Sequence, residues 1–304
     1  MENNFDYKEY NEKKYKTKYW TITRSKYKWF SNYVKLRVFK EWAEDVQNKD
    51  AFLDLGGGVG NWAFHFLNKY KKVIVLDISE EALRHIPEKE IIKVAGSATK
   101  IPLKNESVDC ILLADVFEHI LPKDLNKMMS ELYRVLRKNG LIIIYTTQYG
   151  YGIDLIRKRL FGLMDGRLKL SEKNSGHLNR LKFSEFKRLI RKHNLYLEDY
   201  YHYSIIFKQL VEFTKNSIAK IIGKFTKDKS VREGQKIKDK MKSIKEPNIA
   251  FRIIFGTISF MLYFDILLFG KLIQGSSIFL KIRKSSGFGL SDAQDVSLDI
   301  RKIK

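Results

Sequence analysis

The sequence predicts an α/β protein with a Rossmann-like, doubly wound and mostly parallel sheet, and three observations favour that class. Short apolar runs alternate with stretches of helical periodicity between residues 51 and 147, which is the pattern of βαβ units. A glycine-rich segment follows the first apolar run directly, as in nucleotide-binding turns. The second run ends in an acidic residue about 20 residues further on, the usual spacing for a group that binds a ribose.

The predicted strands and helices of this sheet follow from the two periodicities. Apolar runs predict five strands at Ala51–Leu55, Val73–Ile78, Glu90–Ala95, Val108–Ala114 and Leu141–Thr146. Helical spacing predicts helices at Asn61–Tyr70, Ser79–Ile86 and Pro122–Arg137, the last one capped by Asn139-Gly140.

The segments on either side of the five strands extend the predicted domain. A polar arm (residues 1–24) precedes a helix predicted from Ser25 to Gln47, whose apolar residues are Trp29, Tyr33, Leu36, Phe39 and Trp42. A helix at Ser184–His193 and a strand at Leu195–Tyr203 complete a domain that we place at residues 48–204, with residues 1–47 as its N-terminal extension.

The C-terminal third contains a predicted helical insertion at residues 205–270. It comprises an amphipathic helix at Ile205–Gly223, a charged linker at residues 224–246 and a strongly hydrophobic stretch at Ile249–Gly270. The 18 residues Ile253–Gly270 would span about 27 Å as a helix, whereas the hydrocarbon core of a membrane is roughly 30 Å thick. The carboxylate of Asp265, which is costly in hydrocarbon, also interrupts this stretch. We therefore expect the insertion to lie on a membrane surface without crossing it; the alternative is a helical cap over the sheet or a dimer interface. A last strand is predicted at Ser276–Lys284, within residues 271–284, before a polar tail at residues 285–304.

Charge and cysteine content narrow the classes of partner and chemistry. The 57 Lys and Arg residues exceed the 35 Asp and Glu residues by a net charge of +22, which favours a polyanionic partner, either nucleic acid or an anionic membrane. The single cysteine, Cys110, lies in an apolar run and rules out a disulfide framework and a cysteine-based zinc site. We expect no metal ion.

The charged N-terminus lacks a secretory signal, so we expect a cytoplasmic protein that can attach to the inner face of the cell membrane.

The glycine-rich loop after the first strand indicates the kind of cofactor. A dinucleotide loop would need a third glycine at position 61, which is Asn61, and no Gly-Lys-Ser/Thr follows as a phosphate-binding loop requires. Instead, Asp54 precedes glycines at positions 56, 58 and 60. Such a loop can approach a bulky ligand without a pyrophosphate while Asp54 reaches an ammonium group. S-adenosylmethionine has an ammonium group and no pyrophosphate; the alternative is an ordinary tight turn.

Asp77, at the end of the second strand, is the predicted ribose-binding residue. Its carboxylate can accept hydrogen bonds from the two vicinal ribose hydroxyls, and Ile78 offers an apolar face to an adenine ring. The alternative, that Asp77 caps the helix starting at Ser79, is compatible with that role.

Five ordered motifs resemble the class I S-adenosylmethionine-dependent methyltransferases of the type-11 group, which are related to the quinone-biosynthesis C-methyltransferases. The motifs are FLDLGGGVG (52–60), VLDIS (75–79), AGSATKIP (95–102), VDCILLADVFEHI (108–120) and ELYRVLRKNGLIIIYTT (131–147). The resemblance implies that S-adenosylmethionine is the cofactor and that its binding residues are Asp54, Gly56, Gly57, Gly58, Gly60, Asp77, Ile78, Ser97, Ala98, Ala114 and Asp115.

The resemblance also assigns places to these residues. Ser97 and Ala98 would lie at the adenine edge, and Ala114 and Asp115 would border the methionine moiety. Many members have Asp at the position of Ser97, so the contact with the adenine amino group is expected to be weaker or to come from the backbone. The last strand is expected to return antiparallel into the sheet edge.

Methyl transfer needs alignment of donor and acceptor, and a base only if the acceptor must lose a proton. His119, after the fourth strand, and His177 are the candidate bases; the alternative for His119 is packing against the sheet. The Asn/Asp-Pro-Pro-Tyr motif of many amino-directed methyltransferases is absent, because residues 114–117 read Ala-Asp-Val-Phe. The arm and first helix are expected to cover the cofactor cleft with Trp29, Phe30 and Tyr33, or simply to dock on the sheet.

Three functional hypotheses follow. The first is methyl transfer to oxygen or carbon of a small, amphipathic or lipid-like acceptor at or near a membrane surface. The second is an RNA methyltransferase, which the charge favours although no RNA-binding module is recognisable. The third is a non-catalytic protein that retains the fold, against which the intact Asp54, glycine loop and Asp77 argue.

Overall fold

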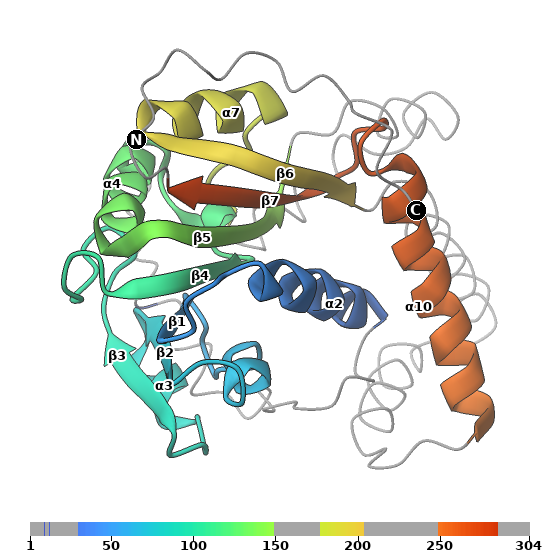
Figure 1. The fold of residues 1–304 in the computed structure, drawn as a ribbon, viewed down its shortest axis with the longest axis horizontal. Coiled ribbons are helices and arrows are strands. Elements are labelled where there is room, and N and C mark those ends of the chain that lie inside the picture. Colours follow the sequence, from blue (N-terminus) through green and yellow to red (C-terminus); the bar gives the residue numbers. More distant parts are fainter. Residues whose placement is uncertain (1–8, 10–11, 13–29, 149–176, 204–248, 285–304) are drawn as a thin grey trace, which may run out of the picture.

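The computed structural model describes residues 9, 12, 30–148, 177–203 and 249–284, which form a seven-stranded sheet with the order β3-β2-β1-β4-β5-β7-β6 (Figure 1). The register pairs every neighbouring strand in parallel except β7, which is antiparallel to β5 and β6. The strands are β1 (Ala51–Leu55), β2 (Lys72–Asp77), β3 (Ile91–Ala95), β4 (Val108–Ala114), β5 (Leu136–Thr147), β6 (Leu195–Tyr203) and β7 (Ser277–Lys284). The predicted fold class is confirmed.

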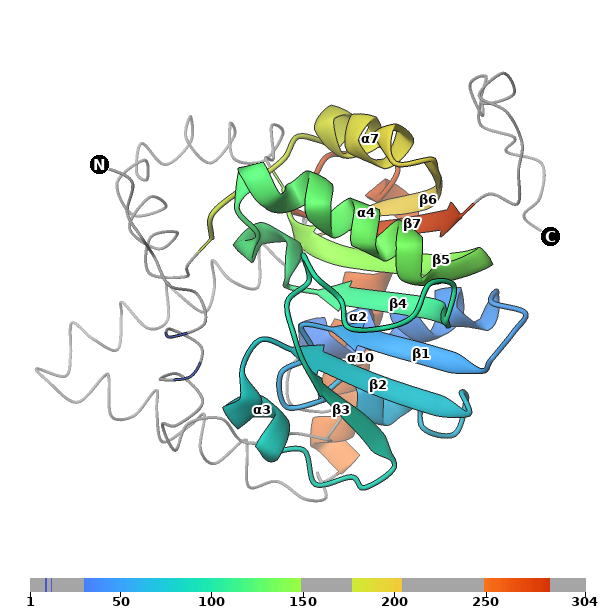
Figure 2. The same ribbon diagram turned by 90° about the vertical axis from the view of Figure 1, so that its left-hand side faces the viewer.

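Helices cover both faces of the sheet (Figure 2). One face carries α2 (Phe30–Glu44), the 3₁₀ turn η1 (Ala63–Phe66), α3 (Glu80–Arg84) and α10 (Ile249–Phe269); the other carries α4 (Leu125–Val135) and α7 (Phe183–Lys192). Two short 3₁₀ turns, η2 (Phe117–His119) and η3 (Pro122–Asp124), connect β4 to α4. Because helices bury both faces, the central strands β1 and β4 are buried along their length and mostly apolar, each with one aspartate.

Two predicted helices differ from the structure. The segment Asn61–Tyr70 forms only η1 and flanking turns, because its aromatic residues favour helix weakly and pack on the sheet, with Phe66 stacked on Phe52 at 4.1 Å between ring centroids. The helix predicted to end at Arg137 ends at Val135, and Asn139-Gly140 does not cap it. Leu136 already belongs to β5, where it pairs with Val108, and the register shift that follows accommodates residues 137–140.

The last strand is antiparallel, as expected, but it does not lie at the sheet edge. β7 is inserted between β5 and β6, and β6 is the edge strand. The physical reason is that Ile278, Phe279, Leu280 and Ile282 of β7 are fully buried, so both faces and both edges of this strand need neighbours.

The described part of the predicted insertion, α10, packs against α2 and the end of β6. Leu262, Tyr263 and Ile266 are buried there, and the Tyr263 hydroxyl donates a hydrogen bond to Glu41 at 2.9 Å. Among the described residues, no helix combines the length and apolarity that a membrane crossing needs. Five predicted parts lie outside the described residues: the arm at residues 1–24 apart from residues 9 and 12, Trp29, the helix Ile205–Gly223, the linker at residues 224–246 and the tail.

Candidate functional site

The glycine loop lies between the carboxyl ends of β2 and β4. Gly56, Gly58 and Gly60 have φ angles of 71°, 55° and 72°, a left-handed conformation that favours glycine. A Cβ atom on Gly56 would lie 2.5 Å from Val116 Cγ2, and one on Gly57 would lie 2.6 Å from Asp54 Cγ. At these two positions the loop therefore has no room for any side chain larger than the hydrogen atom of glycine.

Two buried carboxylates hold the loop. Asp54, which is 1% exposed, accepts a hydrogen bond from the backbone N–H of Ala63 at 3.1 Å. Asp77, which is 7% exposed, accepts bonds from the N–H groups of Gly58 at 2.8 Å and Ser79 at 2.9 Å. The cap of α3 is the hydroxyl of Ser79, so the helix-cap alternative for Asp77 is wrong. Asp77 joins the second strand to the glycine loop instead.

Asp115 lies at the carboxyl end of β4 and has a left-handed backbone with a φ of 58°. Its N–H donates to the carbonyl of Tyr145 at 3.0 Å, which fixes this turn against β5. Its carboxylate accepts a hydrogen bond at 2.7 Å from the ammonium group of Lys35, which comes from α2 and lies 3.8 Å from the centre of the Tyr145 ring. Sequence reasoning missed Lys35; the one available signal was a lysine between Val34 and Leu36 on an apolar helix face.

The two candidate histidines, far apart in the sequence, lie together in the structure. The ring centroids of His119 and His177 are 5.1 Å apart, beside the carboxylate of Glu118. Glu118 is 1% exposed and accepts a hydrogen bond from the Thr146 hydroxyl at 2.8 Å. Burial and, after it, the charge of Asp115 raise the pKa of Glu118 to about 7. Sequence reasoning did not select Glu118, although it precedes His119 directly.

Comparison with known proteins identifies the domain that carries this geometry. Residues 53–144 match the family described as a methyltransferase domain. This segment is a class I methyltransferase domain. It includes the glycine loop, Asp77 and the turn at Asp115, so the resemblance noted in the sequence is confirmed.

Individual relatives resemble the methyltransferase domain over about a third of the chain. A methyltransferase-like protein of Schizosaccharomyces pombe is 31% identical over 115 residues, which are 36% of this chain and 44% of that protein. The demethylmenaquinone methyltransferase of Streptomyces avermitilis is 29% identical over 105 residues, 34% of this chain and 44% of that enzyme. The matches thus span less than half the length of these relatives.

A solved structure supports the fold. Phosphoethanolamine N-methyltransferase 2 of Haemonchus contortus superposes with a TM-score of 0.51 at 14% identity, covering 82% of this chain and 52% of that one.

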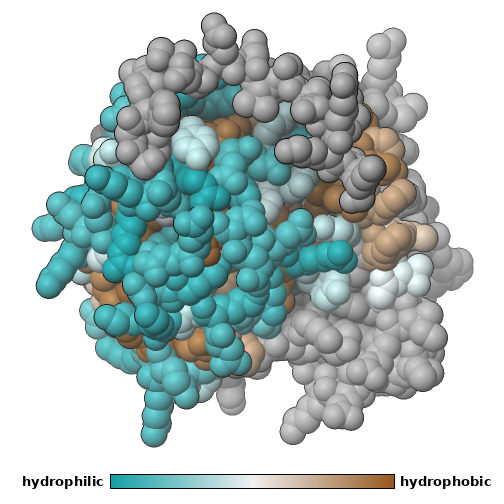
Figure 3. Space-filling view, viewed as in Figure 1, coloured by the Kyte–Doolittle hydropathy of each residue, from teal (hydrophilic) through white to brown (hydrophobic). Residues whose placement is uncertain are grey.

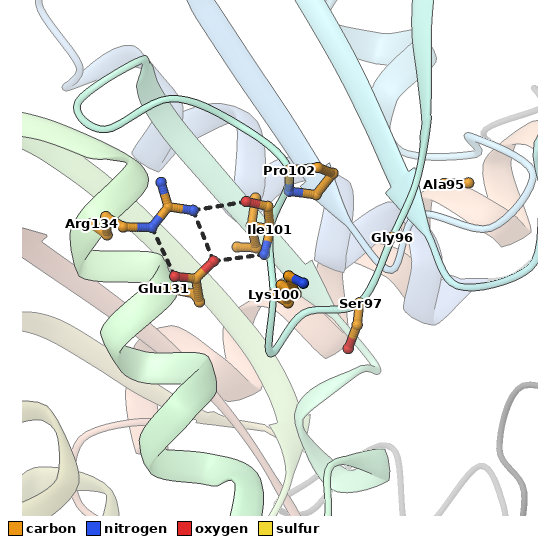
Figure 4. A pocket seen from close by; sticks show the side chains of 8 residues that line it. All are labelled: Ala95, Gly96, Ser97, Lys100, Ile101, Pro102, Glu131 and Arg134. Atoms are coloured by element: carbon orange, nitrogen blue, oxygen red, sulfur yellow. Dashed lines mark hydrogen bonds and ion pairs between the residues drawn. The ribbon is translucent and has the colours of Figure 1, made fainter.

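A hollow of about 530 Å³ lies beside the methyltransferase domain's predicted adenine edge (Figure 4). It is lined by the loop after β3 and by α4, and Ser97 is the member of the predicted cofactor set that lines it. Glu131 and Arg134 of α4 hold the loop: Glu131 accepts the N–H of Ile101 at 2.6 Å, and Arg134 donates to the carbonyl of Ile101 at 2.7 Å. The sequence analysis missed this acid–base pair, whose spacing of three residues on a helix was its signal.

The remaining predicted residues lie around these groups. Ile78, Ala98 and Ala114 are half-buried, and the Ser97 hydroxyl accepts the N–H of Thr99 at 3.2 Å, which closes its own turn.

In the predicted lid, α2 docks on the sheet through buried Phe39 and Trp42. That is the docking alternative; whether the helix also covers a bound cofactor stays a prediction.

Proposed function

We propose that this protein transfers the methyl group of S-adenosylmethionine to a small, amphipathic or lipid-like acceptor at or near a membrane surface. The observation that carries the proposal is the glycine loop closed on Asp54 and Asp77 at the carboxyl end of a doubly wound sheet. Ligands of such sheets bind at that end of the strands.

The residues present suit this cofactor. Cβ atoms at Gly56 and Gly57 would collide with Val116 and Asp54, so only glycine lets the loop pack this closely against the ends of the strands where a cofactor would bind. Asp77 provides a buried carboxylate for the ribose hydroxyls, and Asp54 provides a buried negative charge for a cofactor with a net positive charge. When bound, the cofactor supplies an electrophilic methyl group on a sulfonium.

The protein's own contribution is binding and alignment. Asp77 and the loop hold the ribose, Ile78, Ser97 and Ala98 border the adenine, and Ala114 and Asp115 border the methionine moiety. Because methyl transfer is an in-line displacement, fixing the two reactants on one axis lowers the barrier whether or not the acceptor also loses a proton.

An apolar surface on α10 supports an amphipathic acceptor near a membrane. One side of α10 is buried, but Phe260 and Leu267 of this helix and Leu272, in the turn just after it, are 63%, 54% and 75% exposed. Figure 3 shows apolar side chains gathered over this part of the molecule. The net charge of +22 adds attraction to an anionic leaflet, to which each basic residue near the surface contributes about 1 kcal/mol.

Calorimetry tests the central claim. We expect binding of S-adenosylmethionine and S-adenosylhomocysteine and no binding of NAD. Asp77→Ala should lose about 1.5 to 3 kcal/mol, or roughly ten- to a hundredfold in affinity, because ribose hydroxyls lose their acceptor. Asp77→Asn, which keeps an oxygen for the loop N–H groups, separates binding from folding, and Asp124→Ala on η3 is the matched control. Unchanged affinity in both Asp77 variants contradicts the assignment.

A further inference from the structure

Three side chains beyond the glycine loop form a cluster of metal-ligating groups. One ligand atom each from Glu118, His119 and His177 lies within 4.8 Å of the other two. Glu118 and His119 belong to η2, which follows β4 at the end of the sheet where ligands bind.

The backbone holds this cluster together. The N–H groups of Leu178 and Asn179 donate to the carbonyl of Glu118 at 2.8 and 3.1 Å, and the Asn179 side-chain amide donates to the carbonyl of Phe117 at 2.9 Å. The segment that begins at His177 is thereby tied to η2. The Thr146 hydroxyl orients the carboxylate from β5. The three ligand groups therefore come from positions that hydrogen bonds define.

The chemistry of the set selects the class of ion. Two imidazoles and one carboxylate are the donors of open sites for Zn²⁺, Fe²⁺ and related divalent ions, in which water or substrate fills the remaining positions. Bonds of about 2.1 Å would draw the two imidazoles inward by side-chain rotation. A buried carboxylate is costly unless a cation compensates it, and Asp115 adds a second carboxylate nearby, although Lys35 pairs with that one.

We propose that Glu118, His119 and His177 bind a divalent transition-metal ion, and that this ion binds a hydroxyl group of the acceptor. The proposal rests on the methyltransferase function proposed above and specifies an oxygen acceptor. It departs from the sequence-based expectation of no metal.

The reaction balances without a further reactant. Binding to the ion lowers the pKa of the acceptor hydroxyl, as it does for metal-bound water, and the proton passes to solvent. The resulting oxyanion attacks the methyl carbon, the carbon–oxygen bond forms as the carbon–sulfur bond breaks, and S-adenosylhomocysteine leaves. The two histidines then act as ligands, whereas the sequence suggested each as a base.

Metal binding is tested directly on the full chain. Chelator-treated and desalted protein is titrated with Co²⁺, whose visible absorption reports nitrogen and oxygen ligands. We expect one equivalent of Co²⁺ to bind. Three variants, His119→Ala, His177→Ala and Glu118→Gln, should each weaken Co²⁺ binding by more than about tenfold, because even the loss of a residue that only orients a ligand weakens metal binding that much. His193→Ala, at the residue that caps the C-terminus of α7, is the matched control, and thermal unfolding verifies that each variant is folded. A wild-type chain without stoichiometric Co²⁺, or folded ligand variants that bind it as tightly, overturns the metal site.

A second measurement tests the hydroxyl acceptor. 4-Nitrocatechol, a diphenol whose absorption shifts when it ionises, is added to the Zn²⁺-loaded and desalted protein. We expect ionisation below its pKa in free solution with the wild type and not with His177→Ala. Ion binding without this shift overturns the acceptor class. Calorimetry with S-adenosylmethionine on the same preparations distinguishes the two proposals. A protein that binds the cofactor but no metal ion contradicts only the metal site, whereas a protein that does not bind the cofactor contradicts the proposed function.

Discussion

The ammonium group of Lys35 lies 2.7 Å from the carboxylate of Asp115, although 80 residues separate them in the chain. The Lys35 side chain is 10% exposed and that of Asp115 is 47% exposed, so the pair extends from the interior to the rim of the site. It connects α2 to the turn that follows β4, next to the glycine loop. The first helix is thereby coupled to the proposed methionine-binding turn.

This pair predicts an energetic coupling. Lys35→Met and Asp115→Asn should each destabilise the protein, and the double variant should be less destabilised than the sum, with a coupling energy of about 1 kcal/mol. Asn retains the tolerance of residue 115 for a left-handed backbone. Urea unfolding of the four proteins measures the coupling. Strictly additive losses would show that the pair contributes nothing.

The contact beneath the glycine loop predicts opposite effects for two glycine substitutions. Gly57→Ala places a methyl group 2.6 Å from Asp54 Cγ, so we expect a loss of about 1 to 3 kcal/mol in unfolding free energy and more than tenfold in cofactor affinity. Gly256→Ala in α10 meets nothing within 4 Å and should stabilise by about 0.5 to 1 kcal/mol. Thermal unfolding and calorimetry on both variants make the comparison. Equal behaviour of the two would refute the close approach.

His202 predicts a loss of stability in acid. Its Nδ1 lies 2.6 Å from Gln148 Nε2, and burial lowers the pKa of His202 from 6.5 to about 4. Below pH 6.5 the unfolded chain binds a proton at His202 that the folded chain does not bind. The contribution of neutral His202 to the free energy of unfolding is therefore fully present above that pH. It should fall by up to about 3 kcal/mol as the pH approaches 4.

Urea unfolding between about pH 4.5 and 7.5 measures this dependence. His202→Gln should flatten it, whereas His85→Gln, a substitution at an exposed position, should leave it unchanged. A slope that survives His202→Gln would assign the effect to other groups.

The exposed apolar side of α10 predicts membrane attachment. Replacing Phe260 and Leu267 of α10, together with Leu272 in the turn just after it, with Ser should abolish flotation with anionic liposomes at low salt, because the apolar area buried in the membrane contributes to binding. Ile92→Ser changes an exposed apolar residue on β3 and serves as the control. The wild type should float with anionic vesicles and poorly with neutral ones. Wild-type protein that stays unbound at low salt would contradict membrane attachment through this side.

Local patterns in the sequence were sufficient to predict the seven strands and the glycine loop. β1, β4 and β6 have the predicted bounds, because alternation and apolar runs depend on residues that are close in the chain. Asp54, the glycines and Asp77 were recognisable for the same reason: a strand that ends in an acid next to a tight turn is a local motif. The helix predicted at Asn61–Tyr70 was wrong because contacts with the sheet outweighed weak local propensity.

By itself, the sequence determined the strand–helix alternation, the class of fold and the carboxylates of the loop. Only the tertiary structure decided that β7 enters between β5 and β6, that Lys35 reaches Asp115, and that His177 joins Glu118 and His119. Each of these depends on where distant segments meet in space. That is set by burial of whole faces and by hydrogen bonds such as the one between Asn179 and Phe117, 62 residues apart, which no local pattern encodes.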